Sequence, residues 1–424
     1  MTALLGCIAD DFTGGTDLAG MLVKSGMRTI QMIGVPAGPL PGDVDAVVIA
    51  LKSRTAPAED AITESLAALR YLQSAGCRQF YFKYCSTFDS TSQGNIGPVT
   101  EALMDALGVD FTIACPAFPA NQRTIYKGYL FVGDVLLNES GMRDHPLTPM
   151  KDANLVRVLQ GQATRKVGLV DYTAVSKGAS AIVERFGALR QEGYGFAIID
   201  AVSNDDLVEL GAACADLALV TAGSGVALGL PQNFRSQGLL ADDVEADALP
   251  NTSGLRAVIA GSCSNATQGQ VAAMREHHPA LQIRPSSLAQ GKNIVADALD
   301  WAASRVTNEP VLIYATTTPE EVRAAQADLG VERAGALVEN ALAAIAQGLV
   351  KLGVGQMIVA GGETSGAVVK ALGVKGLRIG PEIDPGVPWT TTLPNEGDRP
   401  LALALKSGNF GTPDFFLKAW SWLP

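Results

Sequence analysis

The chain has few of the residues that build metal sites and disulfide frameworks, and it lacks the long apolar run of a membrane span. Its 424 residues include six cysteines, with no CxxC pair, and three histidines. A structural zinc site needs closely spaced Cys and His ligands, so we expect no structural metal. Scattered cysteines in or beside apolar runs are typical of reduced, buried thiols, which predicts a cytoplasmic protein. No apolar stretch reaches the roughly 18 residues of a membrane helix, and the amino terminus lacks a basic signal region, so we expect no membrane partner.

Two common nucleotide-binding motifs are also absent from the sequence. No GxxxxGK[ST] occurs, which argues against a Walker-type site. No GxGxxG follows a predicted strand, which argues against a dinucleotide fold and therefore against an oxidoreductase. The formal net charge of −11 argues against nucleic acid as the main partner. A local site can still bind a small anion.

What the sequence does contain is an alternation of short apolar runs and helix-length segments, typical of parallel α/β folds. A chain of 424 residues is long enough for two domains. We therefore predict an α/β protein with two domains, each built on a largely parallel sheet flanked by helices, and a ligand site in the cleft between them. The linker is expected at 238–254, where acidic residues, Pro and Gly show weak periodicity. The predicted domains are residues 1–245 and 255–424.

The predicted strands and helices form two series, one in each domain. The first comprises strands Leu4–Ala9, Arg28–Ile33, Ala46–Leu51, Gln79–Lys83, Phe111–Ala114, Val167–Val170, Phe196–Asp200 and Leu217–Val220, with helices Pro57–Ala75 and Ala179–Glu192. The second comprises strands Leu255–Ala260, Leu281–Arg284, Val311–Ala315, Met357–Ala360 and Leu401–Leu405, with helices Ala334–Leu352 and Asp414–Trp420.

Polar residues follow the predicted strands of the first domain. Open parallel sheets bind ligands beyond the carboxyl ends of their strands, so these residues should share one edge. They lie in the segments "ADDFTGGTD", "KSRT", "KYCSTFDSTSQGNIG" and "CPAFPANQRT". The residues predicted to bind the substrate are Asp10, Asp11, Arg54, Lys83, Ser86, Asp89 and Arg123.

The segment "ADDFTGGTD" combines features for two kinds of ligand group. Gly14 and Gly15 would expose backbone N–H groups, and a helix expected to begin near Thr16 adds a positive dipole end, which favours an anion. Adjacent Asp10 and Asp11 should point to opposite sides of an extended chain, so one of them should face the ligand. Carboxylates accept hydrogen bonds from hydroxyls, so a small polyhydroxy acid matches both features. The alternative is that Asp11 only caps the helix and the glycines only form a turn.

The second domain carries three glycine-rich loops after three predicted strands: "GSCSNAT", "GGETSG" and "KSGNFG". Glycines and small hydroxyl residues at a helix start bind phosphate through backbone N–H groups and hydroxyls. Glu363 could accept a hydrogen bond from a ribose hydroxyl or hold a Mg²⁺-bound water. Each loop alone could be an ordinary tight turn. Three of them in one domain predict nucleotide binding.

Taken together, these motifs resemble those of the four-carbon acid sugar kinases along essentially the whole chain, with "DHPLTPM" and "LALALKSGNFG" as further matches. The resemblance implies an amino-terminal sugar-acid domain, a carboxy-terminal nucleotide domain and ATP-dependent phosphorylation of the terminal (O4) hydroxyl of a four-carbon acid. The segment "GSCSNAT" is most similar to the branch that acts on 3-oxo-tetronates. The nucleotide contacts that the resemblance implies are Ser262, Gly361, Gly362, Glu363, Thr364 and Gly408.

The expected cofactors are ATP and Mg²⁺, with the ion held partly by phosphates. The sugar acid and ATP are the expected partners, and the chain could form a homodimer. We expect Asp11 to orient the acceptor hydroxyl and take its proton, with Asp10 as the alternate. Three other functions stay open: a threonate kinase, an erythronate kinase, and a sugar-acid-binding protein without catalysis.

Overall fold

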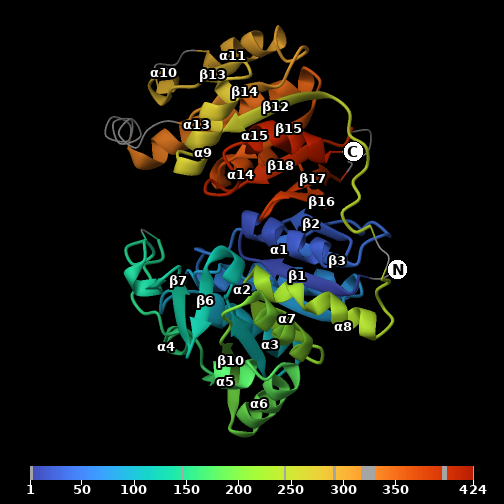
Figure 1. The fold of residues 1–424 in the computed structure, drawn as a ribbon, viewed down its shortest axis with the longest axis vertical. Coiled ribbons are helices and arrows are strands. Elements are labelled where there is room, and N and C mark those ends of the chain that lie inside the picture. Colours follow the sequence, from blue (N-terminus) through green and yellow to red (C-terminus); the bar gives the residue numbers. More distant parts are fainter. Residues whose placement is uncertain are drawn as a thin grey trace. The chain divides into compact units, whose positions relative to one another are not determined.

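The structure is a computed structural model, and it describes residues 3–145, 147–242, 245–289, 293–316, 330–393 and 399–423. The chain divides into two compact units, Met1–Asp247 (unit 1) and Ala248–Pro424 (unit 2). Figure 1 draws unit 1 in blue to green and unit 2 in yellow to red. The division lies within the segment 238–254 predicted as a linker, of which Asp243 and Val244 lie outside the described residues.

Unit 1 is built on a parallel sheet with the strand order β2-β3-β1-β4-β11-β5-β10-β9. Its strands are β1 (Leu5–Ala9), β2 (Thr29–Ile33), β3 (Ala46–Ala50), β4 (Gln79–Lys83), β5 (Thr112–Cys115), β9 (Lys166–Val170), β10 (Tyr194–Ile199) and β11 (Leu219–Ala222). Every residue of β1, β3 and β4 is buried. Burial on both faces explains why these strands read as continuous apolar runs rather than as alternating ones.

The helices of unit 1 follow these strands along the chain (Figure 1). They are α1 (Phe12–Lys24), α2 (Ala58–Ser74), α3 (Ile96–Leu107), α4 (Leu155–Gln160), α5 (Tyr172–Val175), α6 (Ala179–Gln191), α7 (Asn204–Ala213) and α8 (Leu230–Ser236). The strand–helix alternation of a parallel α/β domain, predicted from the sequence, is confirmed here.

Unit 1 also has a small antiparallel sheet that the sequence analysis did not predict. It consists of β6 (Arg123–Tyr126), β7 (Tyr129–Val132) and β8 (Val135–Leu136). The turn between β6 and β7 contains Gly128 at φ 77° and Lys127 at φ 53°. The buried carboxylate of Asp200 accepts hydrogen bonds from both of their backbone N–H groups, at 2.7 and 2.8 Å. The Lys-Gly pair between apolar residues is the local signal that could have identified this hairpin.

Unit 2 has the strand order β13-β14-β12-β15-β18-β17-β16. Neighbouring strands are parallel from β13 to β18, whereas β17 is antiparallel to both β18 and β16. The strands are β12 (Leu255–Ala260), β13 (Ala280–Gln282), β14 (Val311–Tyr314), β15 (Val354–Ala360), β16 (Gly376–Asp384), β17 (Val387–Thr392) and β18 (Ala402–Lys406). The sheet is thus largely parallel, as predicted. The β16–β17 hairpin was not predicted, although Pro385-Gly386 between two apolar runs is a turn signal.

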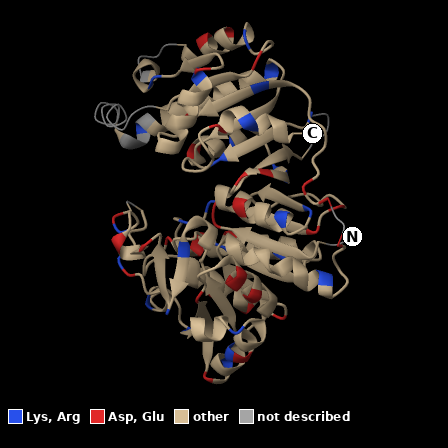
Figure 2. Ribbon diagram, viewed as in Figure 1, with Lys and Arg blue, Asp and Glu red and all other residues tan. Residues whose placement is uncertain are grey.

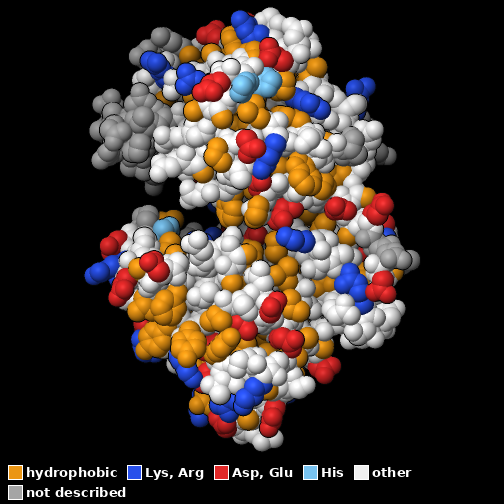
Figure 3. Space-filling model, viewed as in Figure 1, with side chains coloured by type: hydrophobic (Ala, Val, Ile, Leu, Met, Phe, Trp, Pro, Cys, Tyr) orange, Lys and Arg blue, Asp and Glu red, His pale blue; other side chains and the backbone are white. Residues whose placement is uncertain are grey.

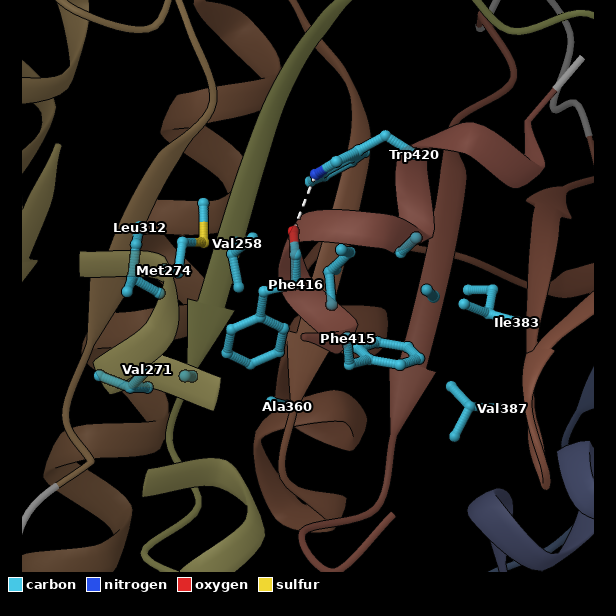
Figure 4. Packing of buried hydrophobic residues seen from close by; sticks show 14 of the residues in the cluster. Val258, Val271, Met274, Leu312, Ala360, Ile383, Val387, Phe415, Phe416 and Trp420 are labelled. Carbon is cyan, nitrogen blue, oxygen red and sulfur yellow. Dashed lines mark hydrogen bonds between the residues drawn. The ribbon is translucent and has the colours of Figure 1, made fainter. Parts of the chain in front are cut away.

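The helices of unit 2 are α9 (Asn265–Arg275), α10 (Pro285–Ala289), α11 (Ile294–Ala303), α13 (Val331–Lys351), α14 (Gly362–Ala371) and α15 (Phe415–Lys418). A hydrophobic cluster lies between one face of the sheet and the helices α9 and α15. In Figure 4 the rings of Phe415 and Phe416 lie among Val258, Ala360 and Val387, and the indole N–H of Trp420 donates to the carbonyl of Phe416 at 2.9 Å. The final helical segment therefore closes the core of unit 2.

Charged side chains lie mainly on helices and connecting segments, and the central strands of both units are almost free of them (Figure 2). On the face seen in Figure 3, acidic and basic side chains are interspersed with hydrophobic ones. None of the helices within the described ranges is long and apolar enough to cross a bilayer.

Candidate functional site

The carboxyl ends of β1, β3 and β4 carry a cluster of charged side chains in unit 1. β1 pairs with β3 on one side and β4 on the other, so the residues that follow these strands meet at one edge. The guanidinium of Arg54, after β3, donates to Asp10 through Nε at 2.8 Å and Nη2 at 2.9 Å. The same Nη2 donates to Asp11 at 2.6 Å. We call Asp10, Asp11, Arg54, Lys83 and Asp89 the charged cluster.

The contact of Arg54 with both aspartates corrects one prediction. Alternation along an extended chain predicted that Asp10 and Asp11 point to opposite sides. The strand ends at Ala9, and the forked guanidinium reaches both carboxylates. The two differ in exposure instead: 4% of the Asp10 side chain is exposed and 26% of the Asp11 side chain. Asp11 is therefore the more accessible of the pair.

Helix α1 begins at Phe12, earlier than the predicted start near Thr16, and Asp11 is its N-cap. The Asp11 carboxylate accepts hydrogen bonds from the Gly14 N–H at 3.1 Å and the Thr13 hydroxyl at 2.9 Å. Asp11 therefore caps the helix, whereas the glycines do not form the turn that the same alternative predicted. The two glycines lie inside the helix, and a Cβ at Gly14 would overlap the Lys83 ammonium. Gly14 is therefore required by the packing of Lys83, and its N–H is already bonded within the protein.

The two aspartates have pKa values shifted in opposite directions. Burial raises the pKa of Asp10, even though Arg54 opposes the shift. Burial alone would also raise the pKa of Asp11, but the charges of Lys83 and Arg54, with the hydrogen bonds from Thr13 and Gly14, lower it below its usual value. Burial disfavours the charge of Arg54, yet Asp10 and Asp11 outweigh that effect and raise the pKa of the guanidinium. Asp11 is consequently ionised at neutral pH.

Lys83 and Asp89 complete the charged cluster. The Lys83 ammonium lies 3.9 Å from Asp11 Oδ1, and only 5% of this side chain is exposed. Asp89 Oδ2 lies 4.0 Å from Arg54 Nη1, while its Oδ1 accepts a hydrogen bond from Thr87 at 2.5 Å. Ser86 belongs to the same loop and is partly exposed. The site therefore contains three carboxylates and two cations. It is suited to a ligand with hydroxyl groups, because carboxylates accept hydrogen bonds from hydroxyls.

The loop that carries Asp89 is fixed by two buried residues. Phe88 has φ 53°, an unfavourable value for a bulky side chain, but its buried ring packs edge-on against Tyr84 with centroids 5.3 Å apart. Asn95 is also buried, and its amide donates to the carbonyl of Ser53 at 2.7 Å and to that of Ala56 at 3.1 Å. Asn95 thus ties this loop to the segment that carries Arg54.

Arg123 is the predicted substrate-binding residue that the structure does not bring into the charged cluster. It begins β6, in the separate antiparallel sheet, and its guanidinium donates to the carbonyl of Asn121. The sequence placed Arg123 at the end of the segment that follows predicted strand Phe111–Ala114. β5 ends close to that position, at Cys115, and the chain then makes a short 3₁₀ turn before Arg123 begins β6.

In unit 2 the three glycine-rich loops lie side by side, because β15 pairs with both β12 and β18. The Gly261 N–H donates to the Ala360 carbonyl at 2.9 Å, and the Gly361 N–H donates to the Lys406 carbonyl at 2.8 Å. The Ser264 hydroxyl donates to the Gly408 carbonyl at 2.5 Å. Hydrogen bonds therefore join each loop to its neighbour, and the convergence expected from sequence is present in the fold.

The glycines of these loops differ in what surrounds them. A Cβ at Gly408 would overlap Ser262 Oγ, and one at Gly361, which has φ 128°, would lie 2.9 Å from Thr364 Oγ1. These two glycines are needed for close packing of the loops. A Cβ at Gly362 would meet nothing within 4 Å. Gly362 and Glu363 are both exposed at the start of α14.

Two helices begin at this edge of the sheet. Ser264 caps α9 by accepting from the Thr267 N–H, and Gly361 is the N-cap of α14. Helix N-termini carry partial positive charge and unpaired N–H groups, which favours phosphate. The geometry is that of an anion site built from backbone.

Lys406 is a residue of this edge that the sequence analysis did not select. It ends β18, is fully buried and donates to Thr267 Oγ1 at 3.0 Å. Burial lowers its pKa to about 8. The signal was present in "LALALKSGNFG", where the lysine directly follows an unbroken apolar run, the pattern of a buried strand.

The residues near these loops fit Mg²⁺ carried by a nucleotide better than a metal held by protein alone. Among the residues whose structure is described, no group of three or more His, Cys, Asp or Glu side chains could hold a metal ion. Glu363 is the single carboxylate in the three loop sequences. Mg²⁺ is commonly held by one or two carboxylates together with substrate phosphates.

Comparison with known proteins agrees with this two-site arrangement. Residues 5–230 match the family model described as a sugar-binding N-terminal domain, and residues 257–416 match the one described as a nucleotide-binding C-terminal domain. The 3-oxo-tetronate kinase of Burkholderia multivorans is 63% identical over 98% of this chain and 96% of its own.

Two solved structures have the same fold over nearly the full length. The crystal structure of Haemophilus influenzae protein HI1011 is 47% identical, with a TM-score of 0.85, over 99% of this chain and 100% of that one. A Salmonella typhimurium protein described as a putative tRNA synthase is 44% identical, with a TM-score of 0.91, over 99% of both chains. With both domain models matched in order and this identity sustained along the chain, the protein belongs to the four-carbon acid sugar kinase family.

Proposed function

We propose that this protein is an ATP-dependent kinase that transfers the γ-phosphoryl group to O4 of 3-oxo-tetronate. The observation that carries the proposal is the identity of 63% to a 3-oxo-tetronate kinase, spread over 98% of the chain. The geometry supports it, because unit 1 offers carboxylates for hydroxyl groups and unit 2 offers adjacent helix N-termini for phosphates.

We assign the sugar acid to unit 1 and the nucleotide to unit 2. The names of the two matching domain models support this assignment. In unit 1 the charged cluster and Ser86 would bind the hydroxyls of the acid. In unit 2 the nucleotide would contact Ser262, Gly361, Gly362, Glu363, Thr364 and Gly408. That the two ligands meet in a cleft between the domains stays a prediction.

Phosphoryl transfer needs mainly positioning and charge stabilisation. Asp11 is our choice for the group that orients the acceptor hydroxyl, because it is more exposed than Asp10 and is ionised at neutral pH. Asp10 would act through Arg54, which it holds with two hydrogen bonds. Mg²⁺ would arrive with the ATP phosphates and supply further charge neutralisation there. A homodimer and a cytoplasmic location stay predictions from the sequence.

The test is a coupled assay of ADP release with three acids: 3-oxo-tetronate, threonate and erythronate. We expect the highest kcat/KM with the 3-oxo acid, and ³¹P NMR should identify a 4-phosphate ester as the product. A preference for either unoxidised acid would change the substrate but keep the kinase. ATP binding without ADP release in the presence of all three acids would leave a sugar-acid-binding protein as the remaining function.

The Salmonella protein is described as a putative tRNA synthase, but a nucleic-acid function has little physical support in this chain. The net charge of −11 opposes binding to a polyanion, since nucleic-acid affinity comes largely from neutralised phosphates.

A further inference from the structure

The ammonium of Lys406 lies directly behind the three glycine-rich loops of unit 2. The side chain is fully buried at the end of β18. It faces the same side of the sheet as Ala402 and Ala404, because side chains alternate along a strand. Helix α9 covers that side, and its Thr267 is the nearest polar partner from another element.

All three ammonium protons are used in hydrogen bonds to neutral oxygens. The acceptors are Thr267 Oγ1 at 3.0 Å and the carbonyls of Ser407 at 3.1 Å and Gly408 at 3.0 Å. The Gly408 carbonyl also accepts from the hydroxyls of Thr267 and Ser264. Lys406 therefore joins the third loop to the first turn of α9, the element that begins at the first loop.

This buried cation has no carboxylate partner. No Asp or Glu within the described ranges lies at ion-pair distance from the Lys406 ammonium. The other buried cation among the described residues, Lys83, lies 3.9 Å from a carboxylate oxygen of Asp11. An unpaired charge in a protein interior is costly unless a counter-ion completes the site. A bound anion at the adjoining loops would supply that counter-ion.

We infer that Lys406 is a positioning residue for the nucleotide phosphates. The positive charge of Lys406 is compensated when the polyphosphate binds at the adjoining glycine-rich loops. The inference rests on the proposed function, because it assumes that the anion is the polyphosphate of ATP. This role differs from a purely structural one in one respect. The contribution of Lys406 to nucleotide affinity must grow with the negative charge of the nucleotide.

The first experiment compares Lys406→Met with the wild-type protein by calorimetry, using adenosine, ADP and ATP. Met retains the apolar stem, and the Gly408 carbonyl keeps two hydroxyl donors. We expect ATP affinity to fall by about tenfold or more, ADP affinity to fall less, and adenosine affinity to stay constant. The matched control is Lys370→Met, which removes the same charge from an exposed position of α14 and should change none of the three affinities.

The second experiment needs no substitution at Lys406 itself. An anion bound near a lysine that is partly deprotonated should draw a proton onto it, so ATP binding at pH 8.5 should be accompanied by proton uptake. The ammonium faces a hydroxyl from α9 and two carbonyls of its own loop; the titratable side chains of the other two loops are Cys263 and Glu363. The same measurement in Cys263→Ser, which lacks the thiol of the first loop, is the control. Binding enthalpies in buffers of different ionisation enthalpy measure the uptake.

The outcomes separate this inference from the function. Equal losses for adenosine and ATP in Lys406→Met, or no loss for either, would overturn the inference and leave the kinase intact. Absence of proton uptake at pH 8.5 would also overturn it, even if Lys406→Met did not fold. A wild-type protein that binds no ATP would refute the proposed function and this inference together.

Discussion

Removal of the Arg54 side chain tests the central claim about the charged cluster of unit 1. Arg54→Met keeps the apolar stem and leaves Asp10, whose side chain is 4% exposed, without its two hydrogen bonds. Removing one partner of a buried ion pair typically costs about 3–5 kcal/mol, because the other charge stays buried and unpaired. The Arg54 side chain is 25% exposed, so solvent screens part of the interaction. We therefore expect unit 1 to lose about 3 kcal/mol at pH 7.

The loss should depend on pH with a definite sign. Asp10 is an acid whose native pKa is raised by burial, and removal of Arg54 raises it further. Between the unfolded and native pKa values the native state binds more protons, so stability falls as pH rises through that window. Asp11 has the opposite shift, and its contribution is lost as pH falls below about 4. The deficit of Arg54→Met should consequently be largest near pH 7 and shrink as the pH falls, because protonation of Asp10 removes its unpaired charge.

The assay can follow the two units separately. All four tryptophans lie in unit 2, at positions 301, 389, 420 and 422, so tryptophan fluorescence follows that unit. Far-ultraviolet circular dichroism follows both. In urea, Arg54→Met should shift the dichroism transition of unit 1 and leave the fluorescence transition unchanged.

The matched control is a second bidentate pair in unit 1. Arg157 donates to Asp152 through Nε at 2.8 Å and Nη2 at 2.7 Å, the same geometry as Arg54 with Asp10, but both side chains are exposed. Arg157→Met should cost far less, since solvent screens a surface pair. Adding Asp10→Asn to Arg54→Met should recover part of the loss, because it removes the unpaired charge. Equal losses at the two arginines, or a deficit that does not shrink as the pH is lowered from 7, would refute the reasoning.

Three further predictions concern the ligand sites. Gly362→Val should weaken ATP binding sharply without changing sugar-acid affinity or the fluorescence-detected stability, because a side chain there meets only open space; normal ATP affinity by calorimetry would reject the phosphate-loop assignment. Asp11→Asn should lower kcat by about 10² to 10⁴ with little change in KM, and a decrease of less than tenfold would mean that the base lies elsewhere. Because burial lowers the pKa of Lys406 to about 8, against 10.5 for the free side chain, the unfolded state binds more protons above pH 8. Nucleotide-free unit 2 should therefore gain up to about 3 kcal/mol between pH 8 and 10.5, a gain that Lys406→Met should lack.

The fold class, the strand–helix alternation and the loops that follow the strands could all be predicted from the amino-acid sequence. Strand Leu255–Ala260 was predicted with the boundaries that the structure has, because a buried parallel strand reads as an unbroken apolar run. The glycine-rich loops were identifiable for a related reason: Gly, Ser and Thr directly after such a run form a phosphate-type turn from neighbouring residues alone. Such signals depend only on neighbouring residues, so they can be recognised in a single sequence. Neither the β6–β7 nor the β16–β17 hairpin was predicted, because each is marked only by a two-residue turn signal, Lys127-Gly128 or Pro385-Gly386, and not by a long apolar run.

Which of the polar residues contact one another is known from the tertiary structure alone. Arg54 contacts Asp10 across 44 residues of chain, and Lys406 contacts Thr267 across 139. Both contacts depend on the order of strands in a sheet, which apolar periodicity does not encode. The same order left Arg123 in a separate sheet, although its position in the sequence matched that of the others. Burial then set the chemistry, since desolvation and neighbouring charges gave two adjacent aspartates opposite pKa shifts, and within the described ranges Lys406 has no carboxylate partner behind the glycine-rich loops.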